Sequence, residues 1–225
     1  MTAYNLKRLL LDIAYPNRCP FCNALIAYNE YYCPPCPEKL GFFGDGGEIK
    51  NVARVFTVFE YGEAAAPFVR AVKEGFDGYA VAAAAKLICA VAGDFRALGI
   101  DLITCVPPNK SSLRRRGYNP PALIAAEVSA LTGIPLNAKL LAKTRETEAQ
   151  KGLSAAKRRG NLDGAFSVAK NAACPATVLL IDDVRATGST LSQAAGALLA
   201  AGAESIYAAT VAASPPPSQD LGFRF

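Results

Sequence analysis

The sequence predicts an α/β protein in which a doubly wound, mostly parallel sheet follows a small N-terminal cysteine-rich module. Strand-like runs alternate with helical stretches between residues 52 and 211, which is the pattern of parallel strands joined by crossover helices. Two Cys-x-x-Cys pairs precede this alternation. A length of 225 residues and a hydrophobic content of 52% are enough for one domain of ordinary size and a small module.

The N-terminal module contains two cysteine pairs, Cys19 with Cys22 and Cys33 with Cys36, separated by ten residues. Each pair can hold a metal ion in a tight turn, and together they complete the tetrahedral site of four thiolates that Zn²⁺ prefers. We therefore expect a zinc ribbon, in which the metal supplies much of the folding energy of the module. The alternatives are a redox-active second pair and an iron–sulfur cluster.

The remaining elements follow from the composition of successive segments. We expect an N-terminal helix and zinc ribbon at residues 1–45, the α/β domain at 46–213 and a proline-rich tail at 214–225. The glycines of residues 41–47 indicate a flexible connector between module and domain. In chain order, the expected elements are strand 52–61, helices 64–74 and 79–92, strand 101–106, helix 121–131, strand 178–181, helix 191–199 and strand 205–211.

The run from Val178 to Thr190 is the most informative motif. Four apolar residues predict a buried parallel strand, and Asp182 and Asp183 follow at its carboxyl end, where ligands bind in open α/β sheets. The turn Ala186–Thr190 offers backbone N–H groups, three hydroxyls and Gly188 before a helix, a combination that binds phosphate. The acids suit hydroxyl groups or a Mg²⁺ ion on a polyphosphate. The alternative is a buried strand ending in a solvated turn, whereas Walker A and Rossmann loops are excluded by the glycine and lysine pattern.

Positive charge is concentrated in one stretch of the chain. Between Val106 and Gly160 there are eleven Lys or Arg residues and three Glu residues, a balance of +8 against +5 for the whole sequence. Such a stretch forms a solvated face, a site for a small polyanion or a nucleic-acid surface. Lys110 and the arginines after it follow a strand whose carboxyl end shares the sheet edge of the two acids, so they can face a pyrophosphate group. The long polar segment 147–166 is expected to be a lid, and the absence of His excludes histidine-based acid–base catalysis.

The acidic motif and its turn resemble the signature of type I phosphoribosyltransferases, which bind 5-phosphoribosyl-1-pyrophosphate (PRPP). The whole chain is similar to the ComF-type phosphoribosyltransferases within that group. It departs from their pattern at Pro108-Asn109, where Leu-His is usual, and at Pro120, where Gln is usual. The segments that carry the resemblance are Cys19–Cys36, Val106-Pro107, Arg116-Gly117-Tyr118-Asn119, Gln150 with Leu153, Arg158 with Asn161, and Asp182-Asp183.

This resemblance implies a type I phosphoribosyltransferase-like sheet and assigns roles to individual residues. Asp182, Asp183 and Lys110 are the implied catalytic residues, and the four cysteines of the module are the implied zinc ligands. The residues implied in PRPP binding are Val184, Arg185, Ala186, Thr187, Gly188, Ser189, Thr190, Arg116, Gln150 and Arg158.

The expected function is Mg²⁺-dependent transfer of the phosphoribosyl group of PRPP to an unknown nitrogen acceptor, with release of pyrophosphate. The alternative, which the resemblance also implies, is a non-catalytic competence or DNA-uptake factor that binds single-stranded DNA or proteins of the competence machinery. The sequence contains no run of about 18 apolar residues, so we expect no membrane insertion and a cytoplasmic location.

Overall fold

The computed structural model describes residues 17–27, 30–74, 78–144, 164–169 and 174–215. The expected N-terminal helix, the lid positions Gln150, Leu153, Arg158 and Asn161, and most of the proline-rich tail lie outside the described residues.

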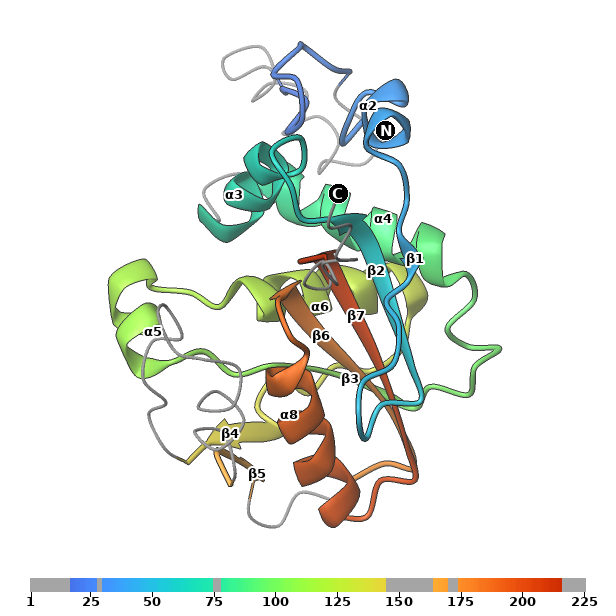
Figure 1. Ribbon diagram of the computed structural model, residues 1–225, viewed down its shortest axis with the longest axis vertical. Coiled ribbons are helices and arrows are strands. Elements are labelled where there is room, and N and C mark those ends of the chain that lie inside the picture. The colour runs from blue at the N-terminus through green and yellow to red at the C-terminus, as the bar shows by residue number, and fades with distance from the viewer. Residues whose placement is uncertain (1–16, 28–29, 75–77, 145–163, 170–173, 216–225) are drawn as a thin grey trace, which may run out of the picture.

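A five-stranded sheet forms the centre of the molecule, with strand order β1-β2-β7-β6-β3 (Figure 1). The strands β2 (Arg54–Glu60), β7 (Ser205–Ala213), β6 (Thr177–Arg185) and β3 (Leu102–Cys105) are parallel to their neighbours. The short β1 (Gly44–Asp45) is antiparallel to β2. The expected mostly parallel sheet is therefore confirmed.

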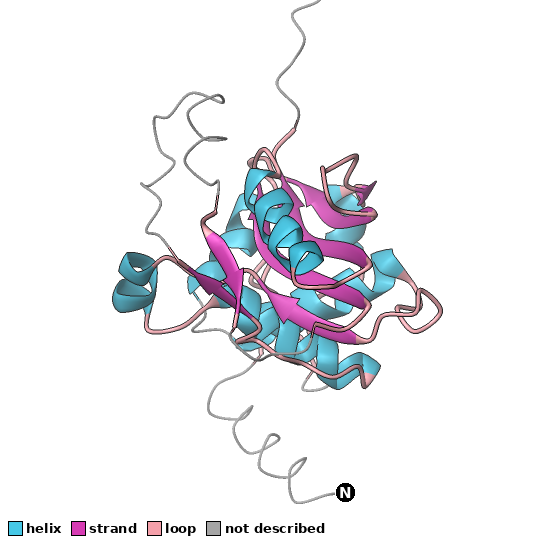
Figure 2. Cartoon of the chain, turned by 90° about the horizontal axis from the view of Figure 1, so that it is seen from below, coloured by secondary structure: helices cyan, strands magenta, loops and turns pink. Residues whose placement is uncertain are grey.

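Helices cover both faces of this sheet, as Figure 2 shows in a second view. One face carries α3 (Ala66–Glu74), α4 (Gly78–Ala92) and α6 (Pro120–Thr132). The other face carries α8 (Ser189–Ala200) and the antiparallel pair of β4 (Leu141–Lys143) and β5 (Phe166–Val168). The doubly wound arrangement is confirmed, with two further helices, α2 (Pro35–Leu40) in the cysteine module and α5 (Lys110–Arg116) after β3.

The sheet divides the hydrophobic core into two clusters, one on each face. In β6, Leu179 and Ile181 face the cluster under α3, α4 and α6, whereas Val178 and Leu180 face the cluster under α8. Successive side chains of a strand point to opposite faces, so a run that is apolar at every position must be buried on both. This explains why the continuous apolar run predicted a central strand.

The glycine-rich segment at residues 41–47 is not a free connector. It contains β1, and the backbone N–H of Gly46 donates to the carbonyl of Val55 at 2.7 Å. A Cβ on Gly46 would lie 2.7 Å from the side chains of Val55 and Thr57, so only glycine can approach β2 this closely. The expectation of a flexible linker was wrong because the segment pairs with β2, and one of its glycines, Gly46, permits that close approach.

The position of the site follows from how the chain leaves two neighbouring strands. After β3 the chain passes through α5 to α6 on one face of the sheet, whereas after β6 it passes to α8 on the other face. Neighbouring connections that leave in opposite directions open a crevice at the carboxyl ends of parallel strands, where ligands bind in this class of fold.

Within the described residues, no single helix is long and apolar enough to cross a membrane. The helices α3 and α4 reach that length only together, with a bend of 118° between them.

Candidate active site and metal centre

Two acids occupy the end of β6, at the crevice. The strand continues to Arg185, so Asp182 and Asp183 lie within its last four residues. They were expected to follow the strand. The carboxylate of Asp182 accepts a hydrogen bond from the N–H of Asp183 at 2.9 Å, and that of Asp183 accepts one from the N–H of Val184 at 2.7 Å. Because they are consecutive in a strand, the two side chains point toward opposite faces of the sheet.

One lysine approaches the acid pair from each face of the sheet. On the α3 side, Lys73 Nζ lies 4.0 Å from Asp183 Oδ2. On the β4 side, the amino group of Lys143 donates to the side-chain oxygen of Asn109, and the charge of Asp182 favours its protonated form. Burial acts in the opposite direction and is the larger effect, so the pKa of Lys143 is lowered.

Asp182 is almost entirely buried, with 8% of its surface exposed. Burial first, and then the negative charge of Asp183, raise the pKa of Asp182 well above its ordinary value, while Lys73 acts weakly in the opposite direction. A bound cation or hydroxyl donor would reverse this effect, because it would stabilise the carboxylate. The acid pair is therefore suited to a ligand that brings positive charge or hydroxyl groups.

Sequence reasoning missed both lysines because neither lies in a recognisable motif. Lys73 occupies the last turn of an amphipathic helix, and Lys143 ends a strand of three residues. Only the packing of α3 and β4 against the two faces of the sheet brings them to the acids. For Lys73 the sole signal was its place in the last turn of an expected helix, which is a common place for a basic residue, and Lys143 lies outside all the expected elements.

One cleft of about 380 Å³ is lined by the two acids, both lysines and the end of α5. Its other walls are the residues after β3, including Pro107 and Asn109, and the first turn of α8. Arg116 lines the cleft, and its expected role in binding PRPP stays a prediction. The replaced family positions Pro108 and Asn109 also border it, so they contact whatever occupies this space.

Lys110 is not among the residues that line the cleft. The segment from Lys110 to Arg116, for which no helix was expected, is the helix α5, in which Lys110 and Arg116 are six positions and therefore roughly 120° apart. Lys110 is exposed, whereas Arg116 is half-buried. The structure thus brings Arg116, but not Lys110, to the acid pair.

The turn after β6 forms a small hollow of about 60 Å³ between Asp182 and the start of α8. Gly188 adopts a left-handed conformation with φ of +76°, and a Cβ there would lie 2.8 Å from the side chain of Ile49. The hydroxyls of Thr187 and Ser189 are 2.8 Å apart. The buried Nε of Arg185 has no hydrogen-bond partner among the described residues. A free buried donor beside hydroxyls and a helix N-terminus fits an anion such as phosphate. The residues around the hollow include Val184, Ala186 and Thr190.

The segment Arg116-Gly117-Tyr118-Asn119 ties the walls of the cleft together. Gly117 ends α5 with φ of +79°. The hydroxyl of Tyr118 donates to the carbonyl of Lys73 at 2.9 Å, and the amide of Asn119 donates to the carbonyl of Val106 at 3.1 Å. This segment therefore positions the end of α3 relative to the end of β3, which explains the use of these residue types.

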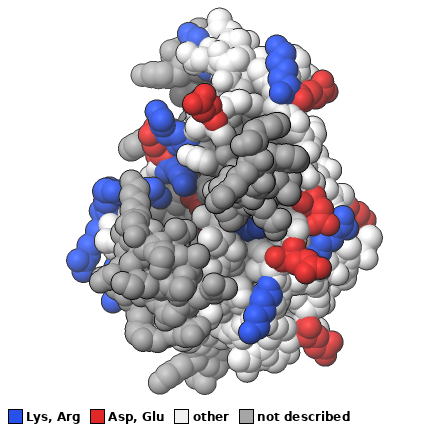
Figure 3. All heavy atoms as spheres, viewed as in Figure 1, with Lys and Arg blue, Asp and Glu red and all other residues white. Residues whose placement is uncertain are grey.

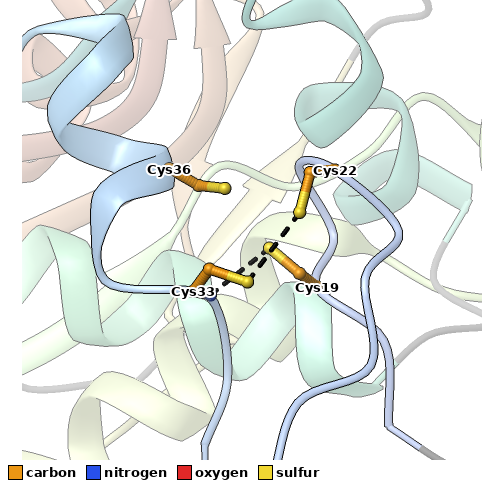
Figure 4. A group of neighbouring side chains, drawn as sticks. All are labelled: Cys19, Cys22, Cys33 and Cys36. Atoms are coloured by element: carbon orange, nitrogen blue, oxygen red, sulfur yellow. Dashed lines mark hydrogen bonds between the residues drawn. The ribbon is translucent and has the colours of Figure 1, made fainter.

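The four cysteines of the N-terminal module converge, with all their sulfur atoms within 4.8 Å of one another (Figure 4). Cys22 and Cys33 sulfurs are 3.8 Å apart, and the N–H of Cys33 donates to the sulfur of Cys19 at 3.4 Å. With Zn–S distances of about 2.3 Å, the sulfurs of a tetrahedral zinc site lie about 3.8 Å apart. The donor set and its spacing therefore fit Zn²⁺, as the sequence predicted.

The thiols of this cluster shift one another's pKa values in different directions. Burial and the negative charge of Cys19 and Cys22 raise the pKa of Cys36 to about 12. Burial also acts to raise the pKa of Cys19, but N–H donors, first that of Cys33, lower it to about 7. A divalent cation removes the repulsion among the thiolates, so a metal is the natural occupant of the cluster.

An aromatic contact fastens the metal module to the main domain. Phe21, between the first two cysteines, stacks on Phe68 of α3 with ring centres 4.2 Å apart and meets Phe59 of β2 edge-on at 5.8 Å. The helix that receives Phe21 is the same one that presents Lys73 to Asp183 at its other end.

Two curated proteins are similar to this chain in sequence. No protein-family model matches the chain. Competence protein F of Haemophilus influenzae is 42% identical over 94 residues, which cover 41% of this chain and 41% of that protein. DNA utilization protein YhgH of Escherichia coli K12 is 26% identical over 210 residues, which cover 89% of this chain and 92% of that protein. The resemblance to ComF-type proteins is confirmed.

A glutamine PRPP amidotransferase from B. subtilis, solved in complex with ADP and GMP, is a further match among solved structures. It is 22% identical with a TM-score of 0.36, and the match covers 63% of this chain and 26% of that one.

Proposed function

We propose that the cleft binds PRPP with Mg²⁺ and transfers its phosphoribosyl group to a nitrogen acceptor, releasing pyrophosphate. The observation that carries this proposal is the arrangement of charges across one space. Two acids and a phosphate-binding turn from β6 face Lys73, Lys143 and Arg116, which come from three other elements. A ligand that carries hydroxyls in its middle and phosphate groups at both ends matches this distribution of charge.

Each part of PRPP has a counterpart among the residues. The 5′-phosphate fits the turn Ala186–Thr190, with the free Nε of Arg185 beside it. The ribose hydroxyls fit the carboxylates of Asp182 and Asp183. The pyrophosphate fits the wall formed by Asn109 and Lys143. A Mg²⁺ ion would supply positive charge on the pyrophosphate, and the carboxylate and hydroxyl oxygens here are ligands of the kind that it accepts.

The reaction needs little more than positioning and electrostatics. As the bond from C1 of the ribose to pyrophosphate breaks, positive charge grows on the sugar and negative charge grows on the leaving group. The acids stabilise the first, and Lys143 and Arg116 stabilise the second, in a partly buried site where such effects are strong. The lack of histidine is no obstacle, because an acceptor nitrogen is itself nucleophilic.

The test is calorimetric titration of the chain with PRPP in the presence and absence of Mg²⁺. Asp182→Asn with Asp183→Asn should weaken Mg·PRPP binding by about 100-fold, because two charge-assisted contacts are lost. Asp94→Asn with Glu204→Gln removes the same charge from two exposed acids and should leave the affinity unchanged. An unchanged affinity in the Asp182/Asp183 variant would contradict the proposal, and pyrophosphate release with nitrogen acceptors would separate an enzyme from a binder.

A second candidate function is binding of single-stranded DNA without catalysis. Three consecutive arginines, Arg114, Arg115 and Arg116, lie on α5, and the first two are exposed. On a helix they fan out over roughly 200°, which suits an extended phosphate backbone better than one small ligand. The names of the two relatives, which refer to competence and DNA utilization, support this candidate.

This second candidate predicts salt-sensitive binding of a single-stranded oligonucleotide, measured by fluorescence anisotropy. Replacing Arg114, Arg115 and Arg116 with Ala should reduce the slope of log affinity against log salt by about 2, since each phosphate contact contributes about 0.7. The matched control replaces three exposed lysines elsewhere, Lys39, Lys50 and Lys139. No binding by the unmodified chain at low salt would exclude this candidate.

A further inference from the structure

A second cavity of about 340 Å³ lies between α3 and α5 and adjoins the cleft. The two spaces share Lys73, Arg116 and Tyr118 in their walls. The second cavity has the size of a site for a small molecule. Tyr61 and Tyr118 give it two aromatic rings, and Tyr61 is 40% exposed.

The charges that line this second cavity are unbalanced. It is bordered by Arg70, Lys73, Arg115 and Arg116 but by one acid, Glu74. Among the described residues, no carboxylate forms an ion pair with any of the three arginines. Figure 3 shows Lys and Arg side chains gathered on the side of the molecule that carries α5 and the end of α3. A cavity with four cations and one acid attracts an anion.

The position of the cavity relative to the acid pair indicates which substrate it could hold. It lies on the α3 side, toward which Asp183 points, whereas Lys143 and Asn109 approach from the β4 side of the sheet. In a displacement the incoming atom and the leaving group occupy opposite sides of the reacting carbon. If pyrophosphate lies on the β4 side, the acceptor must enter from the α3 side.

We propose that the cavity between α3 and α5 is the acceptor pocket and that it selects acceptors carrying an anionic group, a carboxylate or a phosphate, beside the reacting nitrogen. This inference rests on the proposed phosphoribosyl transfer. Arg70 and Arg115 bind the anionic group, and Tyr61 and Tyr118 flank a ring. The nitrogen lone pair forms the bond to C1 of the ribose, the bonding electrons leave with pyrophosphate, and the proton of the nitrogen passes to water.

The experiment compares matched acceptors with and without an anionic group. Aniline, anthranilate and 2-aminophenyl phosphate are supplied with Mg·PRPP to the full chain, and both pyrophosphate release and acceptor binding to the PRPP-loaded protein are measured. The anionic acceptors should bind and react at least about tenfold better than aniline. Arg70→Ala with Arg115→Ala should abolish this preference while leaving Mg·PRPP affinity within about twofold, because neither residue lines the cleft.

The control variant replaces Arg114 and Lys50, two exposed cations that line neither cavity, with Ala. It should retain the preference for anionic acceptors. Equal binding and turnover of the three acceptors, or no binding of either anionic one, would overturn the inference while leaving PRPP binding intact. A variant at Arg70 and Arg115 that loses only oligonucleotide affinity would assign the cavity to DNA and overturn it as well. If the unmodified chain does not bind PRPP, the proposed function is wrong, and this inference fails with it.

Discussion

Asp182 is a buried acid that the fold does not stabilise in its ionised form. Among the described residues it is the one buried acid or base, and its carboxylate has no bonded cation. Burial, and then the charge of Asp183, raise its pKa, so the folded chain disfavours the ionised form. Sites that must bind charge commonly carry this kind of cost.

The cost predicts that Asp182→Asn stabilises the folded chain in a pH-dependent way. Between the unfolded pKa of about 4 and the raised folded pKa, the folded state holds a proton that the unfolded state has lost, so stability falls as pH rises. Asn does not titrate. The melting temperature of Asp182→Asn relative to the unmodified chain should therefore rise from about zero near pH 4 to its largest value at pH 8, by about 2–4 °C for each kcal/mol removed.

Thermal unfolding at pH 4, 6 and 8 measures this effect. Asp94→Asn serves as the control, because Asp94 is exposed and lies away from the acid pair, and it should change the melting temperature little at any of the three. A melting temperature that is lower for Asp182→Asn at pH 8 than for the unmodified chain would mean that the carboxylate stabilises the fold, contrary to the expectation.

At the scale of elements, the features that the sequence predicted well are local ones. The strand β6, its acids and the turn after it are consecutive in the chain, so pattern and spacing were sufficient to place them. The same holds for the two cysteine pairs, since the two cysteines of each pair are only three residues apart in the chain. Where a site is built from contiguous residues, the order of residue types carries most of the information.

The features that the sequence did not reveal depend on contacts between distant segments. Lys73 and Lys143 reach the acids only because α3 and β4 pack on opposite faces of the sheet. Gly188 was read as conformational freedom, but its second constraint is the side chain of Ile49 behind the turn. Such approaches are decided by tertiary packing, which no local pattern records.

The helix α5 is a case in which the signals were present but outweighed. Asn109 before it and Gly117 after it are typical of helix ends, and Gly117 indeed has a left-handed backbone. No helix was expected there, because prolines precede the segment and its residues show no apolar periodicity. The difference matters for function, because a loop could have gathered all its cations at one ligand, whereas the helix directs Arg114 away from both cavities.

At the scale of the whole molecule, one helix, α3, joins the cysteine module to the cleft that contains the acid pair. Phe21 of the module stacks on Phe68 near the start of α3, and Lys73 at the end of α3 reaches Asp183. Tyr118 holds the same end of that helix through its hydrogen bond to the carbonyl of Lys73. The module is thus placed to brace a wall of the cleft.

This connection predicts that zinc stabilises the main domain through Phe21. We expect a bound Zn²⁺ ion to fold the turn that presents Phe21 to Phe59 and Phe68, so chelation should release that contact and lower the melting temperature of the whole chain. Phe21→Ala loses about 2 kcal/mol of half-buried aromatic packing, or about 4–8 °C, and should also shrink the shift caused by chelation, because the contact is already gone.

Leu25→Ala, an exposed change in the same module, should leave both values unaltered. Calorimetric melting of the three proteins with Zn²⁺ or a chelator measures the coupling. Equal chelation shifts in all three would show that the module and the domain melt independently.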